Sequence, residues 1–443
     1  MLSRIARTLW GDISRQELKK FGLLSLIFFF IIGSYWMLKV MKNSLFMHLV
    51  GPQGLPYAKM VSIVSLIVLL LFYNKLIDIF EKTKLLYIIS IFYGFLYLII
   101  SVLLTHPTIG IENTAAGNDR ILGWVIYVAI ESFGSIVVAL FWSFVATIMD
   151  PTSGKRGYPI IVAGAQLGSI FTTFFLMTQT SRFGVPLLMA MAACCVLLVP
   201  LMVKIFHTHH YEAVSNAEQK YEKKIDSKDS KKSTGMIEGL RLIGSHTYLL
   251  GILVVSTAYE MIGVLFELQM EYSAKAALNS LEKVTEFLGF YGLMMNGISF
   301  LFALIGTSFF MRRFGLTACL VLYPIFIACM VSFSWVFPGL WMFFTASILI
   351  KGFGYALNNP CKEIMYIPTS NDIKFKAKSW IDVQGNRSAK SVGAAIAAIF
   401  PIASQLLLYG SIISLGIIGF WVPIALFVGR KHQNLVQNNQ IVS

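Results

Sequence analysis

Ionisable side chains lie inside long apolar stretches of this sequence, where a charge is costly unless another group compensates it. Within a membrane, such residues are candidates for binding sites, ion pairs or proton pathways. The set consists of Lys39, Lys42, Glu131, Glu260, Glu267, Glu271, Lys351, Lys362, Glu363, Arg387 and Lys390.

The spacing of these residues places several of them on shared helix faces. Residues three, four or seven positions apart lie on the same side of an α-helix. Such groups are Lys39 with Lys42, Arg387 with Lys390, and the series Glu260, Glu267 and Glu271. Because lipid cannot satisfy a charged stripe, each stripe is expected to face a cavity or a partner helix.

The cations of this set outnumber the carboxylates, which restricts the solutes that they could bind. A neutral sugar needs no charged cluster, and a lipophilic cation would need the opposite sign. A polyphosphate suits lysine and arginine donors from several helices, with carboxylates that hold the cations apart in the empty state, gate the cavity or carry protons. The predicted substrate-binding residues are Lys39, Lys42, Glu131, Glu267, Lys351, Lys362, Arg387 and Lys390.

A structural role is the alternative for each of these residues. Charged groups near helix ends, such as Lys42, can extend to the aqueous interface or cap the helix, as can Glu271 and Glu363. Arg387 and Lys390 follow a basic loop and could be interfacial. Glu131 and Glu267 lie well inside apolar stretches, where the alternative is a structural ion pair.

Membrane-spanning helices must position these side chains. The chain has 443 residues, of which 56% are hydrophobic and 13% are charged, whereas soluble domains have about 25% charged residues. Mean hydropathy is +0.71, and apolar runs of about 20 residues recur along the whole chain. We predict an all-α membrane protein with about twelve transmembrane helices. The predicted spans are 21–43, 57–79, 84–105, 121–149, 158–180, 184–206, 246–271, 285–310, 315–335, 338–361, 383–404 and 407–429.

Lysines and arginines in the loops between these spans account for the net charge of +14. With the N-terminus inside, the inside segments hold roughly two dozen lysines and arginines and the outside loops about four. The outside residues are Arg120, Arg182, Lys275 and Lys283. This bias predicts an even number of helices with both termini cytoplasmic, and it explains the basic pI without a nucleic-acid partner.

The order of the spans predicts two halves of six helices. Residues 1–206 form the N-terminal bundle, 207–245 a charged cytoplasmic linker and 246–443 the C-terminal bundle. This is the layout of major-facilitator-type transporters, whose halves are repeats with the substrate site between them near the membrane midplane. Gly164 and Gly168 form a small-xxx-small motif, which we interpret as close helix packing within one subunit.

The sequence shows no signature of an enzyme, a cofactor or a metal site. It lacks the P-loop pattern and a nucleophile constellation. The five cysteines have no metal-ligand spacing, and we interpret them as packing residues. His207, His209 and His210 have no carboxylates or cysteines at ligand spacing. We therefore expect neither catalysis nor a bound cofactor.

Four stretches resemble the nucleotide transporters of the plastid and intracellular-bacterial ATP/ADP translocase type. Residues 35–45 are similar to the family's helix-1 pattern Leu-Arg-Asp-Thr-Lys-Asp, and 131–138 to its Glu-Leu-Trp-Gly-Ser-Val segment. Residues 259–267 resemble its helix-7 stretch, which ends in an acidic residue. Residues 359–368 are close to Pro-Cys-Lys-Glu-Met-Ala-Tyr-Ile-Pro, and 382–391 continue that match.

The resemblance implies a major-facilitator-like fold and nucleotide transport. It also implies roles in transport for the charged residues at the family's matching positions, Lys42, Glu131, Glu267 and Lys362. The sequence departs from the family pattern in helix 1, where Lys39 stands for arginine and Val40 and Asn43 stand for aspartates. These departures leave open whether the chain exchanges ATP for ADP or imports other nucleotides, such as GTP, with protons.

We expect a monomeric transporter in a bacterial inner membrane that works by alternating access. Two alternatives remain at this stage. One is a transporter of inorganic phosphate or another organophosphate, and the other is a receptor or scaffold that uses a transporter fold without moving a solute.

Overall fold

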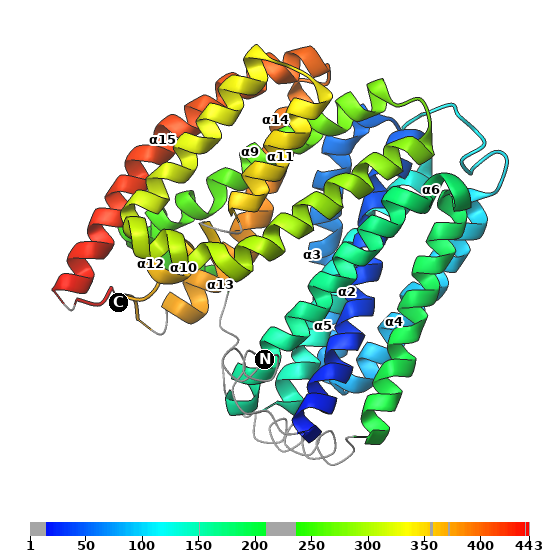
Figure 1. Cartoon of the computed structure of the whole chain (residues 1–443), viewed down its shortest axis with the longest axis horizontal. Coiled ribbons are helices and arrows are strands. Elements are labelled where there is room, and N and C mark those ends of the chain that lie inside the picture. Colours follow the sequence, from blue (N-terminus) through cyan, green and yellow to red (C-terminus); the bar gives the residue numbers. More distant parts are fainter. Residues whose placement is uncertain are drawn as a thin grey trace, which may run out of the picture. The chain divides into compact units, whose positions relative to one another are not determined.

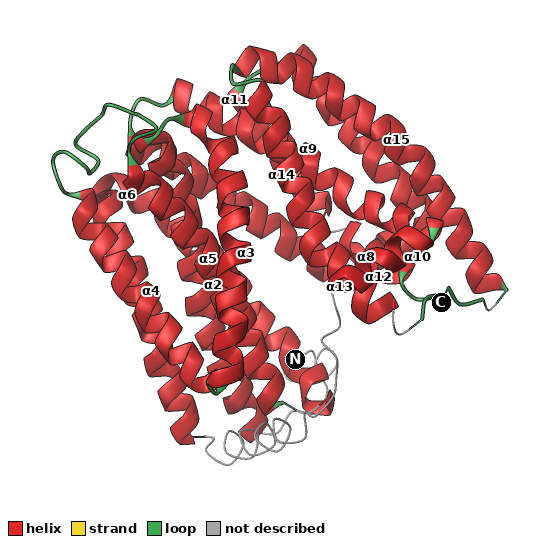
Figure 2. Cartoon of the chain, turned by 180° about the vertical axis from the view of Figure 1, so that it is seen from behind, coloured by secondary structure: helices red, strands yellow, loops and turns green. Residues whose placement is uncertain are grey.

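A computed structural model describes residues 15–149, 151–209, 236–354, 358–370, 373–438 and 440–442. Within these ranges the chain is almost entirely helical, and β-structure is confined to one isolated bridge between Thr369 and Val442 (Figure 2). Most of the described residues of the predicted spans lie in helices. The predicted all-α fold class is therefore confirmed.

The helices of the first half follow the predicted apolar runs closely. They are α2 (Arg15–Leu49), α3 (Leu55–Ile79), α4 (Lys82–Leu104), α5 (Ile121–Ile148) and α6 (Pro151–His209) (Figure 1). The long α6 contains both the fifth and the sixth predicted span, and its backbone breaks at Gly184, where φ is +74°. Glycine adopts this left-handed conformation without the Cβ clash that other residues meet.

The second half contains three long helices and several short ones in the described residues. Its long helices are α9 (Thr247–Ala277), α10 (Leu281–Val336) and α15 (Ala403–Gln437), and α10 breaks at Gly315, where φ is +73°. The shorter α-helices are α8 (Met236–Ser245), α11 (Leu340–Phe353), α12 (Asn359–Met365), α13 (Lys378–Trp380) and α14 (Asn386–Ile399). Two π-helical turns, Ile373–Ala377 and Ile381–Gly385, flank α13.

Eight helical segments of the described chain are long and apolar enough to cross a membrane by length and composition. One of them, 157–209, contains two of the predicted spans. The predicted spans 338–361 and 383–404 are shorter as α-helices, because α11 and α14 have 14 residues each. At about 1.5 Å per residue, such a helix is about 21 Å long, which is less than the hydrocarbon thickness.

The chain divides into two compact units, each of which is made of several separate sequence segments. One unit comprises residues 1–51, 64–231 and 279–296, and the other comprises 52–63, 232–278 and 297–443. The helices α3 and α10 therefore each contribute residues to both units. Most of the predicted linker lies outside the described residues, and its last ten residues form α8.

Glycines bring α2 and α6 into close contact in the first unit. A Cβ added to Gly164 would lie 2.6 Å from the carbonyl oxygen of Ser25. A Cβ on Gly168 would collide with the carbonyl oxygen of Phe29, and one on Gly33 would lie 3.3 Å from the carbonyl oxygen of Gly168. Since no larger residue fits at these distances, the motif at Gly164 and Gly168 packs helices within the chain, as predicted.

The helix α9 is the most enclosed element of the second unit. Two-thirds of its most apolar stretch is buried, and it packs against α11, α14 and α15. A Cβ on Gly393 of α14 would lie 2.7 Å from the carbonyl oxygen of Met261, so the two backbones are close there. The Gln269 side chain donates a hydrogen bond to the carbonyl oxygen of Leu406 on α15 at 3.1 Å. These contacts fix the face of α9 that carries the carboxylates.

Candidate functional site

An ion pair between Lys42 on α2 and Glu131 on α5 is the charged centre of the first unit. The Lys42 side chain is 3% exposed, and its Nζ lies 4.1 Å from the centre of the Tyr127 ring. Tyr127 and Glu131 are four residues apart, so their side chains share one face of α5. The ammonium group is thus held by a carboxylate and an aromatic face, both of which attract a cation.

The neighbours of this pair fix α2 against α5. The Tyr35 ring lies against Gly134, where a Cβ would collide with it. One turn beyond Lys42, the Phe46 ring packs edge-on against Tyr127 at 5.3 Å. Lys39 lies one turn before Lys42, and its Nζ is 4.2 Å from the centre of the Trp36 ring.

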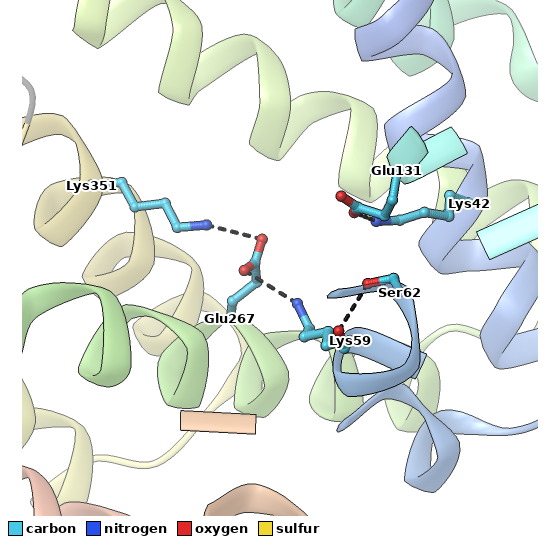
Figure 3. Close-up of polar contacts among 6 residues, drawn as sticks. All are labelled: Lys42, Lys59, Ser62, Glu131, Glu267 and Lys351. Atoms are coloured by element: carbon cyan, nitrogen blue, oxygen red, sulfur yellow. Dashed lines mark hydrogen bonds and ion pairs between the residues drawn. The ribbon is translucent and has the colours of Figure 1, made fainter. Parts of the chain in front are cut away.

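Glu267 on α9 joins two lysines from two other helices of the second unit. Its Oε1 lies 2.9 Å from the Nζ of Lys351 on α11, and its Oε2 lies 3.4 Å from the Nζ of Lys59 on α3 (Figure 3). The three side chains are between 11% and 19% exposed. We refer to Lys59, Glu267 and Lys351 as the Glu267 triad.

A second cluster lies two turns earlier on α9, around Glu260. The Oε2 of Glu260 lies 3.5 Å from the Nζ of Lys390 on α14, and its Oε1 accepts a hydrogen bond from the Tyr259 hydroxyl at 2.8 Å. The Nζ of Lys362 on α12 lies 5.1 Å from the centre of the Tyr259 ring, and Lys362 is 6% exposed. Glu260 and Glu267 are seven residues apart, so both clusters occupy one face of α9, as their spacing predicts.

A more exposed ion pair joins α12 to α13. Glu363 accepts a hydrogen bond from Lys378 at 2.6 Å, and its side chain is 64% exposed. Lys378 also lies over the Tyr366 ring at 5.6 Å. The adjacent residues Lys362 and Glu363 therefore differ sharply in burial, and only Lys362 is enclosed.

The predicted site residues fall into these clusters in different ways. The structure pairs Lys42 with Glu131 and Lys351 with Glu267, and it places Lys362 over Tyr259 and Lys390 beside Glu260. Lys39 lies over Trp36 on its own helix. Arg387 is half-buried on α14, one turn before Lys390.

Sequence reasoning missed Lys59. It lies two residues inside the predicted second span, where a lysine at a helix end commonly extends to the interface. The signal that could have identified it is helical spacing, because Leu55, Lys59 and Ser62 share a face on a helix whose opposite face carries Tyr57 and Val61. Glu260 was recognised as a charge within a span but was not placed among the binding residues.

Metal binding finds no support in the described part of the chain, where no group of three or more histidines, cysteines, aspartates or glutamates could hold an ion. His210 of the predicted histidine group lies outside the described residues. Among the cysteines, Cys319 and Cys361 are buried, whereas Cys194 and Cys329 are exposed.

Comparison with known proteins identifies the sequence family. Residues 1–431 match the profile of the TLC ATP/ADP transporter family. The ADP,ATP carrier protein 1 of Rickettsia prowazekii is 24% identical over an alignment of 494 positions, which covers 99% of this chain and 98% of the carrier. The chloroplastic ADP,ATP carrier protein 2 of Arabidopsis thaliana is 24% identical, over 96% of this chain and 76% of its own length.

Solved structures with the same fold are transporters of several kinds. A bacterial homologue of the iron transporter ferroportin, in an inward-facing state, superposes with a TM-score of 0.63 at 12% identity and covers 94% of this chain and 100% of its own. The nucleoside transporter NupG superposes with a TM-score of 0.59 at 12% identity, over 93% of this chain and 99% of its own. At these identities the likeness establishes the fold, and it confirms the predicted major-facilitator-like architecture.

Proposed function

This chain belongs to the TLC ATP/ADP transporter family and is a multi-pass membrane transporter, and we propose that it carries nucleotides across the membrane by alternating access. Its lysines would bind the phosphates, and its carboxylates would hold those lysines when no substrate is bound. Exchange of ATP for ADP is the leading mode, and import of other nucleotides is the second mode. We propose a bacterial inner membrane as its location.

Pairing of enclosed lysines with carboxylates from other helices is the observation that supports this proposal most directly. Lys42 pairs with Glu131 across α2 and α5, and Glu267 pairs with lysines from α3 and α11. A charge in a membrane protein is costly without a partner, and such pairs add little stability over apolar packing. The presence of these ion pairs is therefore better explained by a function that needs the charges.

Phosphate chemistry fits these lysines. A phosphoryl group offers strongly charged oxygens to ammonium donors, which can replace the carboxylate as the partner of a lysine. We assign phosphate contacts to Lys42, Lys351 and Lys362, with Lys39, Arg387 and Lys390 as further candidates. We assign Glu131 and Glu267 to pairing with lysines in the empty state, and proton coupling is a further possible role of these carboxylates.

Uptake by cells that express the chain tests the proposal. The cells are offered labelled ATP, ADP, GTP and inorganic phosphate, with and without internal nucleotide and with an uncoupler. We expect saturable uptake of a labelled nucleotide, which rises with internal nucleotide if exchange is the mode and falls with the uncoupler if protons are coupled. Uptake of phosphate that no nucleotide inhibits would instead establish a phosphate transporter, and uptake of no solute would favour a receptor or scaffold.

The positive-inside bias of the loops supports a cytoplasmic location for both termini. Reporter fusions at residue 1 and residue 443 test this, with a phosphatase that is active only outside and a fluorescent protein that is fluorescent only inside. Fluorescence from both fusions is expected, and phosphatase activity from either would overturn the orientation.

A further inference from the structure

Lys59 is turned away from the exposed face of its helix and toward a carboxylate. Its side chain is 14% exposed, whereas Tyr57 and Val61 on the same helix are 49% and 42% exposed. A lysine in the second turn of a membrane helix could reach the interface. The side chain of Lys59 is instead directed at Glu267, which indicates that its charge is needed there.

Glu267 presents one oxygen to each of its two lysines. The contact with Lys351 measures 2.9 Å and the contact with Lys59 measures 3.4 Å, each at a different carboxylate oxygen (Figure 3). Two ammonium groups that share one carboxylate repel each other, so each is held less firmly than in an isolated pair. At the longer distance, the Coulomb attraction between Glu267 and Lys59 is weaker than that between Glu267 and Lys351.

The arrangement of the Glu267 triad is that of an anion bound between two cations. A carboxylate bridges two lysines from different helices, and a polyphosphate chain could replace it with more charge and more acceptor oxygens. A chain of two or three phosphoryl groups could reach both lysines at once. A monophosphate has one phosphoryl group and would form fewer charged hydrogen bonds with the two lysines.

We propose that Lys59 and Lys351 bind the polyphosphate chain of the substrate, with Glu267 occupying their ammonium groups in its absence. This inference rests on the proposed nucleotide transport and makes it more specific. It assigns to Lys59 a role in the transporter's selectivity for nucleoside diphosphates and triphosphates over monophosphates.

Transport kinetics of Lys59→Gln test this role. In cells that express each variant, the KM and maximal rate for labelled ADP and ATP are measured, together with inhibition by AMP. We expect the KM for ADP and ATP to rise at least about tenfold, because a charged hydrogen bond is lost. Inhibition by AMP should change by less than about twofold, since a monophosphate depends less on both lysines.

Two further lysine substitutions separate binding from folding. Lys59→Arg keeps the charge and should restore most of the affinity for ADP. Lys84→Gln is the matched control, because Lys84 pairs with Glu81 at 3.1 Å with a side chain that is 67% exposed. It should transport ADP like the unchanged protein. If Lys59→Gln does not reach the membrane, Lys59→Met replaces it, since a methionine places no polar group there.

The possible results distinguish this inference from the proposed function. If the unchanged protein transports ADP, the role of Lys59 is overturned by an unchanged KM in Lys59→Gln or by equal loss of affinity for ADP and AMP. Equal affinity of the unchanged protein for AMP and ADP would also overturn it. Absence of nucleotide transport by the unchanged protein would contradict the proposed function itself.

Discussion

At the scale of single residues, burial distinguishes two of the lysines to which we assign phosphate contacts from an exposed ion pair. Lys42 and Lys362 are 2% and 6% exposed, and each has an aromatic ring beside its ammonium group. Glu363 and Lys378 form an exposed pair, of the kind that contributes about 1 kcal/mol or less. Residues adjacent in sequence can therefore be expected to respond very differently to substitution.

Replacement of Lys42 tests the charged centre of the first unit. We expect Lys42→Ala to abolish uptake, lowering it at least about a hundredfold, because truncation of one partner in an enclosed charge pair costs ~2–5 kcal/mol. Uptake and the amount of protein in the membrane are measured together. The double variant Lys42→Ala with Glu131→Ala removes the unpaired carboxylate and should insert normally while remaining inactive. Normal uptake by Lys42→Ala would contradict the role in phosphate binding.

The neighbouring residues Lys362 and Glu363 provide an internal comparison. Lys362→Ala is expected to abolish uptake, because it removes an enclosed cation of the Glu260 cluster. Glu363→Ala should keep uptake within about threefold of the unchanged protein, since an exposed pair contributes little. Both variants are compared at equal amounts in the membrane. Equal loss in the two variants would show that α12 as a whole, rather than Lys362, is required.

The charged residues were largely predictable at this scale. Spacing on α9 correctly placed Glu260 and Glu267 on one face, and apolar context identified Lys42 and Glu131 as candidates. The partners were not predictable, because pairing depends on which helices are neighbours in space. Lys59 was missed for this reason, since its partner Glu267 lies 208 residues away in sequence.

At the scale of elements, glycines determine how closely the helices approach and where they end. Gly164 and Gly168 allow α6 to contact the backbone of α2, and the break at Gly184 falls at the start of the sixth predicted span. The lengths of the short helices were less predictable. The apolar run 338–361 suggested one continuous span, whereas α11 ends at Phe353, within a segment that contains Gly352 and Gly354.

Substitution of Gly168 tests the packing of α2 on α6. Gly168→Leu is expected to destabilise the protein by about 1–3 kcal/mol or more, because the added side chain must displace the backbone of Phe29. Gly22→Leu on α2 is the matched control, since a Cβ there would meet no atom within 4 Å. The melting temperature of the detergent-solubilised protein is measured for both. Equal melting temperatures would contradict the close contact of these helices.

At the scale of the whole molecule, family membership and fold agree with the predicted transporter. The family profile covers residues 1–431, and the solved transporters share the architecture at low identity. The layout of helices and the basic loops were sufficient to predict this fold, because membrane helices have strong length and composition requirements. The identity of the solute needed the motif at residues 359–368 and the family comparison, since cationic residues alone also suit other phosphorylated anions.

Counterflow of labelled ADP is the most direct test of nucleotide transport. The purified protein is placed in liposomes loaded with unlabelled ATP, and labelled ADP is added outside. We predict transient accumulation of label in the liposomes, which is lost in Lys42→Ala and is not inhibited by inorganic phosphate at the same concentration. Absence of accumulation by the correctly inserted protein, or inhibition by phosphate as strong as that by ATP, would contradict the account.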